Sequence, residues 1–215
     1  MNPGADRLPR RRDEARALFR NAILESAEAV FAERGFHGAR IQDIAQRARI
    51  AVGTVYNHFE HKDEVLFALL EERTEELLAQ LLPMPGDPRS FPERLTVRVA
   101  RVLGYVLRHR AFFTIANEHG LFAGAAPAQA PTSSRRLRQL EKFRTVFRAL
   151  VKEGVASGDL ERLEVDALVR FLGGTIRAFM LSSLADQTTD ADDQARTVVD
   201  LFLHGAGKRK SRRTR

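Results

Sequence analysis

Hydrophobic residues recur every three or four positions along almost the whole chain, which is the period of an amphipathic helix. Phe19, Ile23, Ala27 and Phe31 show this spacing near the N-terminus. No segment has the alternation of hydrophobic and polar residues that favours a strand. The pattern therefore predicts an all-α protein. We expect about nine helices, near residues 13–34, 41–48, 52–58, 62–82, 91–109, 111–122, 133–157, 164–185 and 190–206.

Glycine and proline residues mark where several of these helices end. Gly35 follows the first helix and can adopt the left-handed backbone that often ends a helix. Four prolines between Pro83 and Pro92 interrupt the helical pattern and predict a linker. Ser90 and Glu93 then have the spacing of a capping box, which predicts the start of the next helix. The chain thus divides into a small N-terminal part and a larger C-terminal helical bundle.

The charge of the chain is concentrated at its ends. The formal net charge is +7, but six of the positive charges lie in the last eight residues, so the rest of the chain is nearly neutral. Total charge is therefore weak evidence for a nucleic-acid partner. A basic arm before the first helix and a basic tail after the last are more suggestive, although two solvated tails would explain the same charges.

The composition also excludes several classes of site. The chain has no cysteine, which rules out disulfides, thiolate metal sites and a cysteine nucleophile. His58 and His61 are accompanied by no acidic cluster at ligand spacing, so no metal site and no cofactor are predicted. The Arg-rich first twenty residues lack the apolar segment of a signal peptide. Because Arg101, Arg108 and Arg177 interrupt the longest apolar stretches, no membrane span is predicted and we expect a cytoplasmic protein.

Two short predicted helices, 41–48 and 52–58, are joined by a tight turn. Helices this short need tertiary support, which the long helices before and after them can supply. This is the helix-turn-helix arrangement, in which the second short helix enters the DNA major groove. Val52, Val55 and Phe59 can face the core. The side chains left for contacts with phosphates and base edges are Thr54, Tyr56, Asn57 and His58.

The stretch from Phe36 to Lys62 reads FHGARIQDIAQRARIAVGTVYNHFEHK and resembles the DNA-binding domain of the TetR/AcrR family. Eleven residues match the family's usual pattern at fixed spacing, and the resemblance covers about residues 13–65. The resemblance implies a homodimer on double-stranded DNA with a palindromic operator. It places the DNA-contacting positions at Gln42, Val52, Gly53, Thr54, Tyr56, Asn57, His58 and Lys62.

Three positions depart from the pattern of that family. Arg49 stands in the turn, where glycine is common, so it must tolerate the backbone that the turn needs. Ala39 and Arg40 replace a common Thr-Thr pair, so the first short helix lacks a side-chain N-cap, at a cost of about 1 kcal/mol. Ala51 replaces a common serine and removes one possible phosphate contact. These departures affect details of the contacts and leave the class unchanged.

We therefore predict four segments: a basic disordered arm (1–12), a helix-turn-helix domain (13–62), a ligand-binding and dimerisation domain (63–206) and a basic disordered tail (207–215). The apolar stripes of the last two helices, and the resemblance, predict that these helices form the homodimer. An unknown small-molecule effector is expected to bind in an apolar cavity between the helices of the larger domain. The residues predicted to line it are Tyr105, Phe112, Phe113, Asn117, Phe143, Phe147, Phe171, Arg177 and Phe179.

The predicted function is a transcriptional regulator and not an enzyme. Effector binding would favour a spacing of the recognition helices that does not fit the operator, so the protein would act as a repressor. Arg177 would pair with an acidic effector, with another helix or with solvent. Two alternatives remain: an all-α enzyme, which lacks a nucleophile–base pair in this sequence, and a non-specific DNA binder that uses the basic tails.

Overall fold

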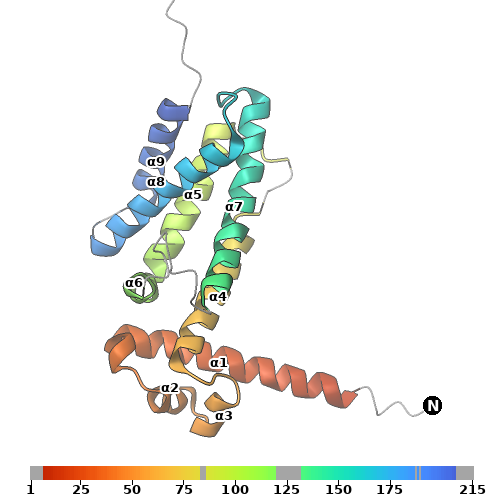
Figure 1. The fold of residues 1–215 in the computed structure, drawn as a ribbon, viewed down its shortest axis with the longest axis vertical. Helices are drawn as coiled ribbons and strands as arrows, with labels where there is room; N and C mark the ends of the chain where they lie inside the picture. Colours follow the sequence, from red (N-terminus) through yellow and green to blue (C-terminus); the bar gives the residue numbers. More distant parts are fainter. Residues whose placement is uncertain (1–6, 83–85, 120–131, 187, 189, 207–215) are drawn as a thin grey trace, which may run out of the picture. The chain divides into compact units, whose positions relative to one another are not determined.

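A computed structural model describes residues 7–82, 86–119, 132–186, 188 and 190–206 (Figure 1). The regular elements in these ranges are all α-helices, which confirms the all-α prediction. They are α1 (Arg7–Gly38), α2 (Ile41–Ala48), α3 (Val52–Tyr56), α4 (Lys62–Gln80), α5 (Phe91–Arg108), α6 (Arg110–Glu118), α7 (Thr132–Ser157), α8 (Val165–Ala185) and α9 (Ala191–Ala206).

The first helix is longer than the sequence pattern predicts. It begins at Arg7, so the second half of the predicted disordered arm 1–12 is helical. Arginine has a high helix propensity, and the turns that follow provide a template on which the helix can extend. Near its other end the backbone leaves the helical conformation at Gly35, with φ of 66° and ψ of 167°. This confirms that Gly35 interrupts the helix. Residues 1–6 and the predicted tail 207–215 lie outside the described residues.

The chain folds as two compact units. The first contains Met1–Arg73 together with Thr114–Phe122, so it extends beyond the predicted boundary at residue 62. The boundaries between the units fall inside α4 and α6. The helical period of each helix continues across its boundary, so the sequence pattern does not mark where one unit ends. The buried core of this unit includes Ile23, Leu24, Ala27, Phe31, Ile44, Val55, Val65, Leu66 and Leu69.

Buried charges also hold the first unit together. Arg73 is only 8% exposed, and its Nη2 donates to Oε2 of Glu28 at 2.6 Å. Nε of the same arginine donates to the same oxygen at 3.0 Å. This pair ties the middle of α4 to α1. A buried charge needs such a partner, because an unpaired one is costly to remove from water.

The turn between α2 and α3 has a left-handed residue at its start. Arg49 has φ of 56° and ψ of 40°, and its N–H donates to the carbonyl oxygen of Gln46 at 3.2 Å. This conformation ends α2 and redirects the chain into α3. It is unfavourable for residues that have a Cβ atom. The turn therefore has the geometry that suits glycine, although this chain places an arginine there.

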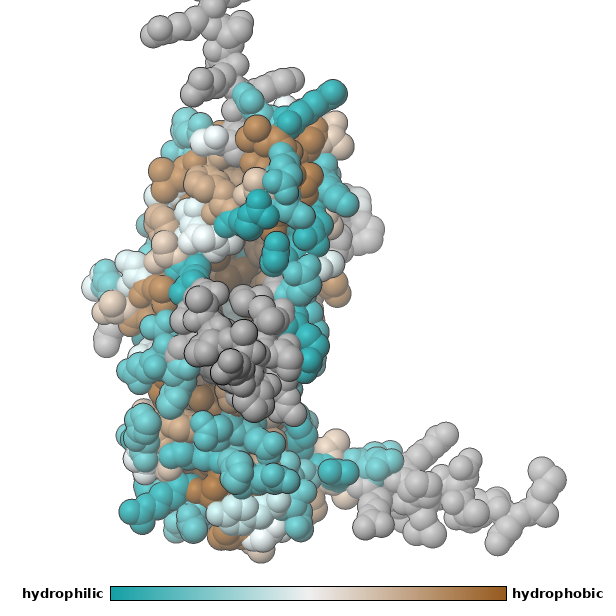
Figure 2. Space-filling model, viewed as in Figure 1, coloured by the Kyte–Doolittle hydropathy of each residue, from teal (hydrophilic) through white to brown (hydrophobic). Residues whose placement is uncertain are grey.

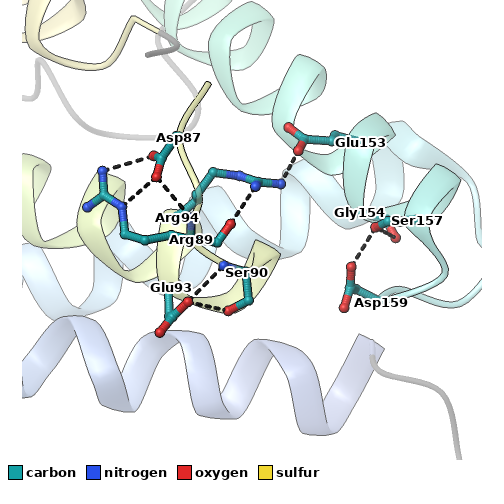
Figure 3. Close-up of polar contacts among 9 residues, drawn as sticks. All are labelled: Asp87, Arg89, Ser90, Glu93, Arg94, Glu153, Gly154, Ser157 and Asp159. Atoms are coloured by element: carbon teal, nitrogen blue, oxygen red, sulfur yellow. Dashed lines mark hydrogen bonds and ion pairs between the residues drawn. The ribbon is translucent and has the colours of Figure 1, made fainter. Parts of the chain in front are cut away.

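The second unit, Thr74–Phe113 and Ala123–Arg215, is a helical bundle. Helix α5 packs against α7, α8 and α9, while α8 also packs against α7 and α9. Its core includes Leu95, Val99, Leu103, Phe112, Val151, Leu160, Leu172, Val198 and Phe202. The predicted capping box is present at the start of α5, where the carboxylate of Glu93 accepts a hydrogen bond from the N–H of Ser90 at 2.7 Å (Figure 3).

The segment before α5 is fixed by a network of polar contacts (Figure 3). Asp87 accepts hydrogen bonds from Nε and Nη2 of Arg89, at 2.8 and 2.9 Å. Arg94 pairs with Glu153 of α7. Next to this pair, a Cβ atom added to Gly154 would lie 2.5 Å from the ring of Phe91. Only glycine allows α7 to approach α5 this closely.

Helix α8 is more hydrophobic than a helix with one solvated face needs to be. By length and composition this helix could cross a membrane. Only 33% of its most hydrophobic stretch is buried, so much of that apolar stretch is exposed. Leu172, Ile176 and Met180 face the core, whereas Phe171 is 48% exposed. Figure 2 shows hydrophobic side chains at the surface in the region of α8. Among the described residues, part of the apolar surface of this helix is therefore left uncovered.

Candidate DNA-binding interface

Helix α3 is attached to its unit through its buried side chains. Val55 is completely buried, and Phe59, just beyond the helix, is 6% exposed. The N–H groups of His58 and Phe59 both donate to the carbonyl oxygen of Val55, at 3.0 and 2.9 Å. The turn of helix thus continues past Tyr56, close to the predicted end at 58. A helix of five residues is unstable alone, so these contacts determine its position.

The opposite side of α3 and the neighbouring part of α2 carry polar side chains without partners. Tyr56 is 49% exposed, and Gln42 and Asn57 are exposed as well. Within the described residues, none of these three side chains makes a hydrogen bond, and neither does Thr54. A Cβ atom added to Gly53 would meet no atom within 4 Å. This surface can exchange water for the phosphates and base edges of DNA.

Lys62 holds the loop between α1 and α2 in place. Its ammonium donates to the carbonyl oxygens of Phe36 and Ala39, at 2.5 and 2.8 Å. It also lies 4.4 Å from the centre of the Phe36 ring. The sequence pattern assigned Lys62 to a DNA phosphate, and the structure adds a structural role. The ammonium has three donors, so one N–H is left for a phosphate.

Helix α2 is tied to α1 by ion pairs. Asp43 lies 2.7 Å from Nη1 of Arg34 and accepts a hydrogen bond from the N–H of Arg40 at 3.1 Å. Arg47 pairs with Glu33 at 2.6 Å. Arg40 has no side-chain cap, as its sequence predicts, but the carboxylate of Asp43 satisfies its N–H. The match to the family pattern at Asp43 therefore reflects support of the helix.

A groove lies between α1 and α3, beside the predicted recognition surface. Its walls are formed by Ala15, Arg16 and Phe19 of α1 and by Thr54, Asn57 and His58 of the segment around α3. The sequence pattern assigned no function to the α1 residues, because nothing in the sequence shows that α1 and α3 are neighbours here. The four-residue spacing of Arg16 and Arg20 does indicate that they share a helix face.

Two arginines of α1 act on His58 at the edge of this groove. Partial burial lowers the pKa of His58 below its usual value of 6.5, and the charges of Arg16 and Arg20 lower it further. The imidazole of the free protein is consequently neutral at pH 7. It can then offer one ring nitrogen as a donor and the other as an acceptor.

Residues 23–69 match the family described as "Bacterial regulatory proteins, tetR family". The match includes α2, α3 and the start of α4, the elements that form the predicted DNA surface. The fatty acid metabolism regulator protein of Bacillus subtilis is 25% identical over 190 residues, which cover 85% of this chain and 93% of that protein. Residues 23–69 therefore form a DNA-binding domain of the TetR family. The predicted resemblance is confirmed, and the protein is a helix-turn-helix transcriptional regulator.

Other TetR-family relatives agree with this assignment. The repressor KstR2 of Mycobacterium tuberculosis is 28% identical over 156 residues, 73% of this chain and 76% of that protein. The structure of FadR from Bacillus subtilis in complex with stearoyl-CoA has a TM-score of 0.73, with 22% identity over 86% of this chain and 97% of that one. The fold is thus shared over most of the length of this chain.

The residues predicted to line an effector pocket in this TetR-family chain lie in different surroundings. Three rings are buried as neighbours: the centres of Tyr105 and Phe113 are 6.2 Å apart and those of Phe112 and Phe113 are 5.2 Å apart. Phe147 is also buried, at 7% exposure. Phe143 and Phe179 are half-buried. The buried aromatic residues provide an apolar interior, and their role as pocket residues remains a prediction.

Three other predicted pocket residues lie apart from these rings. Asn117 is exposed and belongs to the first unit, within Thr114–Phe122. Phe171 is 48% exposed and stacks on Phe202, with ring centres 6.0 Å apart. Arg177 is half-buried, and its Nε has no hydrogen-bond partner among the described residues. Helical periodicity cannot distinguish an apolar residue that lines a cavity from one that lies at the surface. The sequence therefore predicted Phe171 in a pocket, whereas the structure places it at the surface.

Among the described residues, no group of three or more histidine, aspartate or glutamate side chains could hold a metal ion. His58 and His61, the histidine pair considered from the sequence, belong to no such group. The residues around α3 can supply hydroxyls, an amide and an imidazole. These groups suit recognition of DNA by hydrogen bonds.

Proposed function

We propose that this TetR-family regulator is a repressor that binds a palindromic operator as a homodimer and is released by a small-molecule effector. The observation that carries the proposal is the set of unpartnered polar side chains on α2 and α3, held by a core of buried residues. Gln42, Tyr56 and Asn57 are the side chains we assign to operator contact. The relatives described as repressors support the direction of regulation.

The proposed homodimer uses the apolar surface of α8 and α9. Phe171 and Leu201 are 48% and 50% exposed. A Cβ atom added to Gly173 or to Gly174 would meet no atom within 4 Å, so these glycines leave room for a partner helix. Exposed apolar side chains beside small residues are typical of a helical interface. In a twofold dimer the two recognition helices would meet successive major grooves, about 34–36 Å apart.

The proposed effector is an acyl-CoA thioester or a molecule of similar chemistry. The structure of FadR from Bacillus subtilis with stearoyl-CoA motivates this choice. The buried aromatic residues, including Phe112 and Phe147, would receive an apolar chain. The unpartnered Nε of Arg177 would pair with an anionic group of the effector. Helices α4 and α6 each contribute residues to both units, so a change in either helix would couple effector and operator binding.

The operator assignment is tested by selecting bound sequences from a random DNA pool at physiological salt, followed by titration of the selected DNA. We expect a palindromic motif bound by two subunits. Asn57→Ala should weaken binding and relax the sequence preference, because each good contact with a base contributes about 1–3 kcal/mol of discrimination. Lys152→Ala, an exposed change on α7, is the matched control. No enriched motif would contradict sequence-specific binding.

Dimer formation is tested by Leu201→Glu, which places a charge in the proposed interface. We expect a folded monomer by analytical ultracentrifugation and a loss of operator affinity. Ala149→Glu, an exposed change on α7 outside the proposed interface, serves as the control for added charge. A dimer that persists in Leu201→Glu would contradict the proposed interface. Release is tested by adding stearoyl-CoA to the operator complex, with stearate and CoA as separate controls.

A further inference from the structure

The described part of α1 near its N-terminus has one basic, solvent-facing side. Arg16 is exposed and Arg20 is half-buried, and four residues separate them, so they share one face of the helix. Neither side chain has a hydrogen bond or ion pair among the described residues. Within the described part of the chain, no carboxylate forms an ion pair with either guanidinium.

The same face borders the groove that leads to α3. Ala15, Arg16 and Phe19 form its α1 side, and Thr54 and Asn57 lie on the other. Ala15 leaves the groove open because its side chain is short. Phe19 is 43% exposed and offers an apolar wall to a deoxyribose ring. The groove therefore combines cationic, hydroxyl and apolar groups, the combination that a sugar-phosphate backbone requires.

The electrostatic effect on His58 agrees with the placement of these two charges near the groove. Both Arg16 and Arg20 contribute to the lowered pKa of this imidazole, which lies on the α3 side. Charges that act on His58 also act on an anion bound next to it. They would stabilise the anion for the same reason that they destabilise the imidazolium.

We propose that Arg16 and Arg20 bind a backbone phosphate of the operator in the groove between α1 and α3. This inference rests on the proposed operator binding and adds a part of the chain outside the helix-turn-helix to it. The two arginines position the protein on the duplex and read no base. They would thereby fix the depth and angle at which α3 enters the major groove.

The test measures operator affinity against salt concentration for Arg16→Ala and Arg20→Ala, using the full chain and the selected DNA. Each phosphate contact contributes about 0.9 to the slope of log affinity against log salt. A variant that loses the phosphate contact should have a salt slope smaller by about 0.9 and an operator affinity about fivefold lower at 0.15 M salt. The motif selected by each variant should stay the same. Arg196→Ala, an exposed arginine of α9 on the second unit, controls for the loss of one charge.

A second pair of variants tests the groove without removing an arginine. Ala15→Glu places a carboxylate in the groove and should weaken operator binding more than Ala15→Gln, which has nearly the same size. Melting temperatures near that of the wild type would show that these exposed changes leave the fold intact.

The outcomes separate the inference from the function on which it rests. Affinity and salt slope that match the wild type in both arginine variants would overturn the phosphate contact while leaving operator binding by α3 in place. A changed motif would overturn it as well, since the arginines would then read bases. A wild-type chain that binds no selected DNA would refute the proposed function itself.

Discussion

The two units differ in where their unpaired polar groups lie. In the first unit, the polar side chains behind the recognition surface are paired, as Asp43 with Arg34 and Lys62 with two carbonyl oxygens show. The side chains in front of it, such as Tyr56 and Asn57, are exposed and unpaired. A rigid support thus presents groups that are free to bind. This division is what recognition of a fixed partner such as duplex DNA requires.

In the second unit, several surface charges are paired, and three arginine nitrogens are buried without a partner among the described residues. Arg148 bonds Asp166 at 2.7 Å, and Lys142 bonds Glu75 at 2.9 Å. By contrast, Nη1 of Arg110 and Nε of Arg177 are buried without a partner among the described residues. A unit built to bind from its interior would show this pattern. This difference supports the proposal that the first unit binds DNA on its surface, whereas binding by the second would involve its interior.

The largest effect that we expect comes from the core behind the recognition surface. Phe31 is completely buried, so Phe31→Ala should lower the free energy of unfolding by about 3–5 kcal/mol. The same variant should also show faster hydrogen exchange of the backbone amides of α2 and α3. The companion variant Tyr56→Ala should leave stability within about 0.5 kcal/mol, because exposed changes cost little. Unchanged exchange of α2 in Phe31→Ala would show that the surface does not depend on this core.

Lys62→Met separates the structural role of Lys62 from its contact with DNA. Methionine keeps the apolar cover on Phe36 but removes two charge-assisted hydrogen bonds. Because Lys62 is half-exposed, we expect a loss of about 1–2 kcal/mol in the free energy of unfolding, measured by urea denaturation. Lys152→Met on α7 provides the control. A variant that loses operator affinity at unchanged stability would assign Lys62 to phosphate contact alone.

Operator affinity should depend on pH through His58. Burial and the charges of Arg16 and Arg20 lower the pKa of His58 in the free protein below 6.5. A phosphate bound beside the ring favours the imidazolium and raises the pKa, so binding takes up a proton. Affinity should therefore increase as the pH falls into the range where the imidazole of the complex takes up its proton, and be independent of this group at more alkaline pH. Titrations of the operator between pH 5.5 and 8 would check this. His58→Gln should remove the part of the pH dependence that His58 causes. The same pH dependence in this variant would contradict the prediction.

The smallest effect that we expect is a gain in stability at the turn. Arg49 has a left-handed backbone, so Arg49→Gly relieves a strain of about 1–2 kcal/mol, part of which the greater freedom of glycine in the unfolded chain offsets. The net gain should be about 0.5–1 kcal/mol in urea denaturation. Gln46→Gly, within α2, should instead lose about 1 kcal/mol. A loss of stability in Arg49→Gly would mean that the arginine side chain makes a stabilising contact.

Residues near one another in sequence were predicted well. Helix α2 has the predicted bounds, and Gly35 interrupts the helix as expected, because period and backbone preference are local properties. The surface of α3 also followed from its pattern, since Val55 and Phe59 are buried and Tyr56 is exposed.

Features that depend on distant segments could not be predicted in this way. Lys62 bonds carbonyl groups of Phe36 and Ala39, more than twenty residues earlier in the chain, and no periodic pattern encodes that contact. The groove beside Arg16 exists only because α1 packs near α3. Phe171 has the spacing of an interior residue, yet it is 48% exposed among the residues that the structure describes. Which apolar face is covered depends on tertiary packing.

Helix α6 passes from the second unit into the first, and this has a practical consequence. The ring of His119, just after α6, lies 4.1 Å from the ring of Phe36, which is 7% exposed. The first unit is therefore built from two separate stretches of the sequence. A fragment that ends at Arg73 would lack one of the rings that cover Phe36, and solvent would reach an aromatic side chain beside the Lys62 contacts. This fragment should have a lower melting temperature and aggregate more readily than the same residues in the whole chain.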